Sequence, residues 1–74
     1  MGIPDQIVAL LAMQKRLLTS KEIAEMLFGK EKGYPQRVDG DLRELVHQGR
    51  LERLGDGGVG DPYKYRVKPL QVRS

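Results

Sequence analysis

The sequence predicts a mainly α-helical domain with a small β-hairpin, an α+β fold in the order helix, helix, helix, strand, strand. Up to residue 49, apolar residues recur every three or four positions, which is the period of an amphipathic helix. Near the C-terminus the period changes to two, which is typical of a half-buried strand. The 74 residues contain no internal repeat and no linker, so we expect one domain over 1–74, with 69–74 as a frayed tail.

The first helix is predicted from Pro4 to about Leu17. Proline suits the first turn of a helix, because the N–H that it lacks has no partner there. The apolar residues of this segment are spaced by three, four and seven positions and form one stripe. They are Ile7, Leu10, Leu11, Leu17 and Leu18.

The second helix is predicted to begin at Thr19. Glu22 stands three residues later, so the hydroxyl of Thr19 and the carboxylate of Glu22 can each bind a backbone N–H at the helix start. The helix is expected to bury a face that contains Ile23, Leu27 and Phe28. It ends at Gly29.

A loop over residues 29–34, longer than a tight turn, leads to the third helix. Pro35 fits the first position of this helix and Gly49 ends it. A shorter helix capped by Asp39 is the alternative. The buried face is expected to carry Val38, Leu42, Leu45 and Val46.

The hairpin is predicted from residues that alternate near the C-terminus. Tyr63, Tyr65 and Val67 alternate with three basic residues, so we expect the tyrosines to pack in the core. The partner strand is 51–54. Residues 55–62 include four glycines, so this stretch can reverse the chain but favours no single conformation.

The composition restricts the classes of function. The chain has no cysteine and one histidine, which excludes a disulfide and a cysteine-based zinc site. A chain of this size holds one small core, and no serine, histidine and acid stand in a catalytic spacing. The glycine-rich stretch precedes a strand, whereas a nucleotide-binding loop precedes a helix. We therefore expect no enzymatic activity, no metal and no cofactor, and no small-molecule ligand is evident.

No apolar run reaches the roughly 18 residues that a membrane span needs, and the N-terminus lacks a secretory signal pattern. We therefore expect a cytoplasmic protein that does not bind membranes. The net charge of +3 permits nucleic-acid binding. Its surplus lies in residues 50–74, which carry six basic and three acidic groups.

Two segments resemble parts of a known family. Residues 18–24, Leu-Thr-Ser-Lys-Glu-Ile-Ala, resemble the start of the second helix of winged helix-turn-helix domains. Residues 41–46, Asp-Leu-Arg-Glu-Leu-Val, with Gly-Arg-Leu at 49–51, resemble the end of the recognition helix and its passage into the wing. The resemblance covers nearly the whole chain, and small bacterial, archaeal and phage regulators are similar in size. It implies a transcriptional regulator with its third helix in the DNA major groove and its hairpin on the backbone or minor groove, associated with the nucleoid.

Helix geometry selects the residues of the third helix that face a groove in this arrangement. With its apolar face buried, a step of about 100° per residue places Gln36, Arg37, Gly40, Arg43, Glu44 and His47 on the opposite face. Arginine can donate two hydrogen bonds to a guanine edge and glutamine can pair with adenine. Gly40 lets the backbone lie close to the duplex. The candidate DNA contacts of this helix are Gln36, Arg37, Arg43 and His47.

The hairpin supplies a second set of candidate contacts. Its second strand presents three cations on one face, and Arg53 and Arg50 lie on the other strand, which together form a basic ribbon suited to phosphate oxygens. Alternating lysines on an exposed strand are also a common protection against aggregation. The Tyr34 hydroxyl can reach a phosphate, or the ring can anchor the loop. The candidates are Tyr34, Arg53, Lys64, Arg66 and Lys68.

The charge of the third helix counts against tight phosphate binding, since residues 35–49 carry two basic and three acidic groups. The alternative function is therefore a winged-helix module that binds a protein without direct DNA contact. An RNA-binding function is disfavoured because the chain has only four aromatic residues. If double-stranded DNA is the partner, so small a domain makes few base contacts, and we expect a homodimer or a larger regulatory partner.

Overall fold

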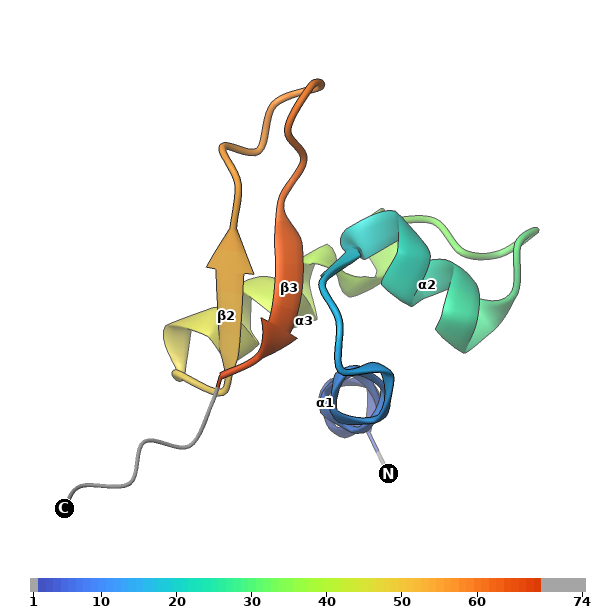
Figure 1. Ribbon diagram of the computed structural model, residues 1–74. Helices are drawn as coiled ribbons and strands as arrows, with labels where there is room; N and C mark the ends of the chain where they lie inside the picture. The colour runs from blue at the N-terminus through green and yellow to red at the C-terminus, as the bar shows by residue number, and fades with distance from the viewer. Residues whose placement is uncertain (1, 69–74) are drawn as a thin grey trace, which may run out of the picture.

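The computed structural model describes residues 2–68; the predicted frayed tail, 69–74, lies outside them. β3 is the middle strand of a three-stranded antiparallel sheet, between β1 and β2. The β2–β3 hairpin projects beyond the helices (Figure 1). No helix in the described range is long and apolar enough to cross a membrane. The elements are α1 (Ile3–Gln14), β1 (Leu18–Thr19), α2 (Ser20–Phe28), α3 (Gln36–His47), β2 (Leu51–Leu54) and β3 (Lys64–Val67).

One hydrophobic core joins all of these helices and strands. α3 contributes the predicted Val38, Leu42 and Leu45, all nearly inaccessible to solvent. Each strand contributes one buried side chain, so the sheet is held to the helices along its width. The buried residues are Ile7, Leu11, Leu18, Ile23, Ala24, Val38, Leu42, Leu45, Leu51 and Tyr65.

α1 is shorter than predicted and ends at Gln14 instead of near Leu17. Lys15 adopts a left-handed conformation with φ of 56°, and its N–H donates to the Leu11 carbonyl. The chain then leaves the helix, so Leu18 is buried in β1 while Leu17 is 37% exposed. The predicted stripe was wrong at these two leucines because a lysine makes the left-handed stop that glycine usually signals.

β1 is a strand that the sequence does not predict, and it changes the predicted order to helix, strand, helix, helix, strand, strand. Leu18 pairs with Tyr65 and Thr19 pairs with Lys64. Two residues are too few to show an alternating pattern, so this strand is created by its partner and not by local sequence.

Thr19 also begins α2, as predicted. Its hydroxyl oxygen accepts a hydrogen bond from the Glu22 N–H at 3.2 Å, and the Glu22 carboxylate accepts one from the Thr19 N–H at 2.9 Å. Both donors lack a helical partner in the first turn, so the two bonds define where the helix starts. The last residue of β1 is thus the N-cap of α2.

The connection from α2 to α3 packs tightly against α2. Gly33 is buried, and a Cβ atom there would lie 2.5 Å from the Cα of Glu25 and 2.7 Å from its backbone nitrogen. α3 then begins at Gln36, directly after Pro35, so the shorter helix capped by Asp39 is not observed. Glycine at position 33 therefore permits the loop to pass beside α2.

The hairpin has the predicted alternation. Tyr65 is buried and Tyr63 is half-buried, whereas the three cations of this strand, Lys64, Arg66 and Lys68, are exposed. β2 pairs with β3 so that Leu51 stands opposite Val67 and Arg53 opposite Tyr65. Because directly paired residues point to the same face of a sheet, the helix-facing side carries Leu51, Arg53 and Tyr65.

The tip of the hairpin has a definite conformation, which the sequence does not predict. The Asp61 carboxylate accepts a hydrogen bond from the Asp56 N–H at 3.2 Å, and the Asp61 carbonyl accepts one from the Gly57 N–H at 3.0 Å. Gly57 has φ of 83°, and a Cβ atom there would lie 2.5 Å from the Tyr63 ring. These contacts close the tip upon itself.

We expect Gly33→Ala to lower the free energy of unfolding by about 2–4 kcal/mol, because the added methyl group meets backbone atoms that cannot move aside alone. Gly58→Ala is the matched control, since a Cβ atom at Gly58 meets no atom within 4 Å, and we expect it to change stability by less than about 0.5 kcal/mol. Urea denaturation measures both. Equal effects of the two substitutions would contradict the close packing of Gly33.

Candidate nucleic-acid interface

The exposed side of α3 carries a line of four residues, Gln36, Gly40, Arg43 and His47, which we call the α3 strip. Their spacings of four, three and four residues keep them along one side of the helix, and all four are exposed. Among residues 2–68, the Gln36, Arg43 and His47 side chains form no hydrogen bond or ion pair. Their polar atoms are therefore available to an external partner.

Arg37, also predicted to contact bases, is held by the protein itself. Its guanidinium carbon lies 3.7 Å from the centre of the Phe28 ring at the end of α2. Its Nη1 donates a hydrogen bond to the Lys32 carbonyl at 3.1 Å. A cation over a ring and a loop carbonyl together favour a role in fixing the α2–α3 loop. Arg37 is therefore not part of the α3 strip.

The predicted basic ribbon is smaller than expected. The Arg66 guanidinium forms an ion pair with Glu52, which stands directly opposite on β2. Arg50 forms a further ion pair, in which its Nη2 lies 3.7 Å from Oδ1 of Asp5 on α1. Within the described chain, Lys64, Lys68 and Arg53 are the cations of this group without an ion pair.

Arg53 lies on the opposite face of the sheet from Lys64 and Arg66, because its partner in the register is Tyr65. Its guanidinium carbon lies 4.3 Å from the centre of the Tyr63 ring. The expectation that Arg53 joins these cations in one ribbon was wrong. Residue counting within one strand does not give the register with its neighbour, so the face of Arg53 could not be predicted.

Tyr65 marks the junction between the hairpin and α3. Burial raises the pKa of its hydroxyl above the usual value of about 10. The positive charge of Arg53 opposes this effect, while the negative charge of Asp39 on α3 adds to it. Charges of α3 and of β2 thus act on the same hydroxyl.

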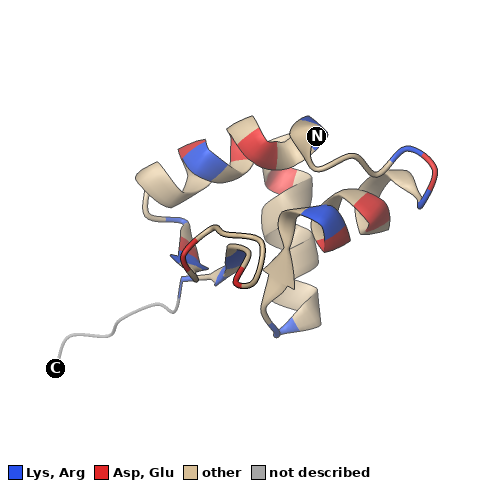
Figure 2. Ribbon diagram, turned by 90° about the horizontal axis from the view of Figure 1, so that it is seen from above, with Lys and Arg blue, Asp and Glu red and all other residues tan. Residues whose placement is uncertain are grey.

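Exposed acidic side chains lie on α3 and at the tip of the hairpin. α3 carries exposed Asp39 and Glu44 next to its strip, and the tip of the hairpin carries exposed Asp56 and Asp61. In the view of Figure 2, α3 carries both basic (blue) and acidic (red) residues, and the loop at the tip of the hairpin carries acidic ones. Phosphates therefore meet repulsion at the tip and at the edges of α3.

Lys21 is a candidate that the sequence prediction missed. It is exposed in the first turn of α2, and Thr19, two residues before it, pairs with Lys64. The capping pattern already placed Lys21 at the start of a helix. Its position two residues after the Thr19–Lys64 pair depends on β1, however, and β1 has no sequence signature.

Tyr34, a predicted contact in the loop before α3, is 60% exposed.

In the described part of the chain, no group of three histidine or acidic side chains is arranged to hold a metal ion. Comparisons with known protein families, with curated proteins and with solved structures give no match.

We expect the stability of the protein to fall as the pH rises through 10. Because the pKa of Tyr65 is higher in the folded state than in the unfolded state, its contribution is complete below the unfolded value and is lost as the hydroxyl ionises. Tyr65→Phe removes this contribution, so the free energy of unfolding should depend less steeply on pH between about 9 and 11. Tyr34→Phe, at an exposed tyrosine, controls for the loss of a phenol. Parallel curves for all three proteins would show that Tyr65 is not the titrating group.

Proposed function

We propose that this chain binds double-stranded DNA as a winged helix-turn-helix domain and acts as a small transcriptional regulator. In this proposal α3 enters the major groove, and the β2–β3 hairpin is the wing that lies on the backbone or minor groove. The observation that carries the proposal is the α3 strip: a straight line of unpaired polar side chains, interrupted by a glycine, on an exposed helix beside a projecting hairpin.

The α3 strip has the chemistry for reading bases. The Arg43 guanidinium can donate two hydrogen bonds to the O6 and N7 atoms of guanine, and the Gln36 amide can pair with adenine. Gly40 stands between them and has no side chain to hold the helix away from the groove. A helix of 12 residues is about 18 Å long, which is enough to span a few base pairs.

Phosphate contacts in this proposal come from three cations at two elements, β3 and α2. Lys64 and Lys68 lie on or directly after β3, and Lys21 lies at the start of α2, where the positive end of the helix dipole adds to its charge. The acidic residues on α3 and at the hairpin tip would keep the phosphates away from those places. We therefore expect moderate affinity for one chain and a homodimer or larger partner on the operator.

Arg43→Ala and Lys64→Ala should weaken DNA binding in different ways. Loss of Arg43 removes a base contact, so the preferred sequence should lose about tenfold to a hundredfold in affinity while non-preferred duplexes lose little. Loss of Lys64 removes a phosphate contact, so every duplex should bind more weakly and the slope of log affinity against log salt should flatten by about one. Fluorescence anisotropy with a selected and a scrambled duplex at several salt concentrations measures both effects.

Lys15→Gln is the control, because it removes one positive charge at the end of α1, an element that carries none of the proposed DNA contacts. Its effect on both duplexes should be smaller than that of Lys64→Ala. Salt-independent or undetectable binding of the parent protein to every duplex would contradict the proposal. It would favour the alternative, a winged-helix module whose acidic α3 binds a basic protein partner.

Gly40→Ala should separate stability from function. A Cβ atom at Gly40 meets no atom of the protein within 4 Å, and alanine is favoured over glycine inside a helix, so the free energy of unfolding should rise by about 0.5–1 kcal/mol. The same methyl group should hinder close approach of the α3 backbone to the groove and weaken DNA binding severalfold. Calorimetry and anisotropy on one preparation measure the two effects. A stabilised protein with undiminished DNA affinity would mean that the α3 backbone stays clear of the duplex.

A further inference from the structure

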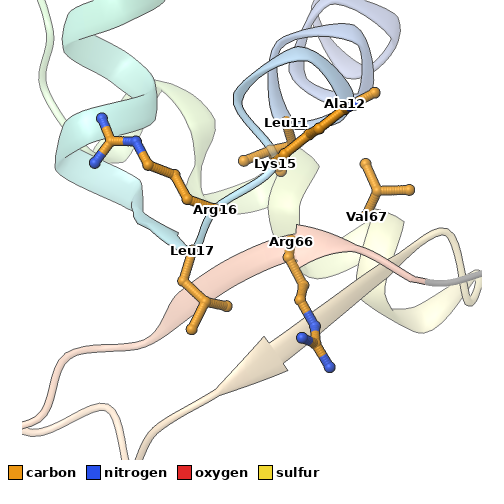
Figure 3. A pocket seen from close by; sticks show the side chains of 7 residues that line it. All are labelled: Leu11, Ala12, Lys15, Arg16, Leu17, Arg66 and Val67. Carbon is orange, nitrogen blue, oxygen red and sulfur yellow. The ribbon is translucent and has the colours of Figure 1, made fainter.

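A pocket of about 420 Å³ lies between the C-terminal end of α1 and the last two residues of β3, Arg66 and Val67. Figure 3 shows the Val67 side chain pointing toward Leu11 and Ala12 of α1, so that one wall is apolar. Leu17 also lines the pocket. Such a volume is at the lower end of the range for small-molecule sites, about 300–1,000 Å³. The pocket therefore suits a small ligand with an apolar body.

The charged residues of this pocket are all basic. Lys15, Arg16 and Arg66 line it, and no acidic residue does. Arg66 is paired with Glu52 and turns its guanidinium toward the other side of the sheet. Lys15 and Arg16 form no ion pair or hydrogen bond through their side chains within residues 2–68. The Arg16 guanidinium points toward the start of α2 in Figure 3, and as an exposed side chain it can turn toward the pocket. The two uncompensated cations thus favour an anionic ligand.

The backbone of β3 adds a further donor. The Lys68 N–H donates to the Arg50 carbonyl on the β2 side, and residues of an antiparallel strand alternate in the direction of their backbone groups. The N–H and C=O of Val67 therefore point to the β1 side. β1 pairs with β3 only at Leu18 and Thr19, so the edge at Val67 carries no partner within the described residues. An unpaired N–H beside two cations is a set of donors that suits a carboxylate.

We propose that this pocket binds a small organic carboxylate with a hydrocarbon or aromatic body. Its carboxylate accepts hydrogen bonds from Lys15 and the Val67 N–H, and from Arg16 after this exposed side chain turns toward the pocket. Its apolar body packs against Leu11, Ala12 and the Val67 side chain. The sequence motifs do not indicate this site, because α1 and β3 are separated by most of the chain. The proposal does not depend on DNA binding, although Arg66 and Val67 belong to the strand that forms the hairpin.

Octanoate, acetate and 1-octanol test the proposal by NMR with the uniformly ¹⁵N-labelled full chain. Octanoate carries both the charge and the apolar body, so it should produce saturable shifts of the Leu11, Ala12 and Val67 amide signals. Acetate lacks the apolar body and octanol lacks the charge, so each should bind at least about tenfold more weakly. Arg16→Gln should weaken octanoate about tenfold, and Ala12→Phe should fill the pocket and abolish the shifts.

Lys32→Gln is the matched control, because it removes an exposed cation of the α2–α3 loop that does not line the pocket. Its octanoate affinity should equal that of the parent. Arg16 and Ala12 are exposed, so both variants should keep the parent spectrum outside the pocket, which confirms that they fold. The proposal is overturned if octanoate shifts do not saturate, if octanol binds as well as octanoate, or if Arg16→Gln and Lys32→Gln behave alike.

Discussion

The structure depends on Thr19, which serves the sheet and the helices at once. As the last residue of β1 it pairs with Lys64, and as the N-cap of α2 it exchanges two hydrogen bonds with Glu22. The direction of α2 is therefore set by the register of the central strand. α3 follows from α2 through a loop that passes close to Glu25, so the placement of the α3 strip beside the hairpin is linked to this single residue.

Local sequence predicts most of the helices, because capping and periodicity act within one or two turns. The start of α2 at Thr19, the buried face of α3 and the alternation of the second hairpin strand are all readable in this way. The end of α1 at Gln14 is not, since a lysine at the next position gives no sequence signal for a left-handed conformation. β1 is not readable either, because its two residues become a strand only beside β3.

The residues of the candidate interface also fall into a group that local sequence predicts and a group that it does not. Exposure of Gln36, Arg43 and His47 follows from the helical period alone, and the structure places them as expected on the exposed side of α3. The surroundings of Arg37, Arg53 and Arg66 depend on contacts between elements: a ring of α2, the register of the hairpin and a carboxylate of β2. A count of basic residues therefore overestimates the positive surface, since a cation that is paired inside the protein attracts an outside phosphate less strongly.

The closed tip of the hairpin has a consequence for how such a chain can diversify. Its hydrogen bonds run between residues 56 and 61, Gly57 packs against Tyr63, and Gly55 packs against the backbone of residues 61–62. The loop thus takes its shape from its own residues and not from the helices. A segment of this kind can be lengthened, shortened or exchanged for another self-closing loop while the core stays as it is. The hairpin is thus an interchangeable extension, and related chains could differ in reach without any change of their packing.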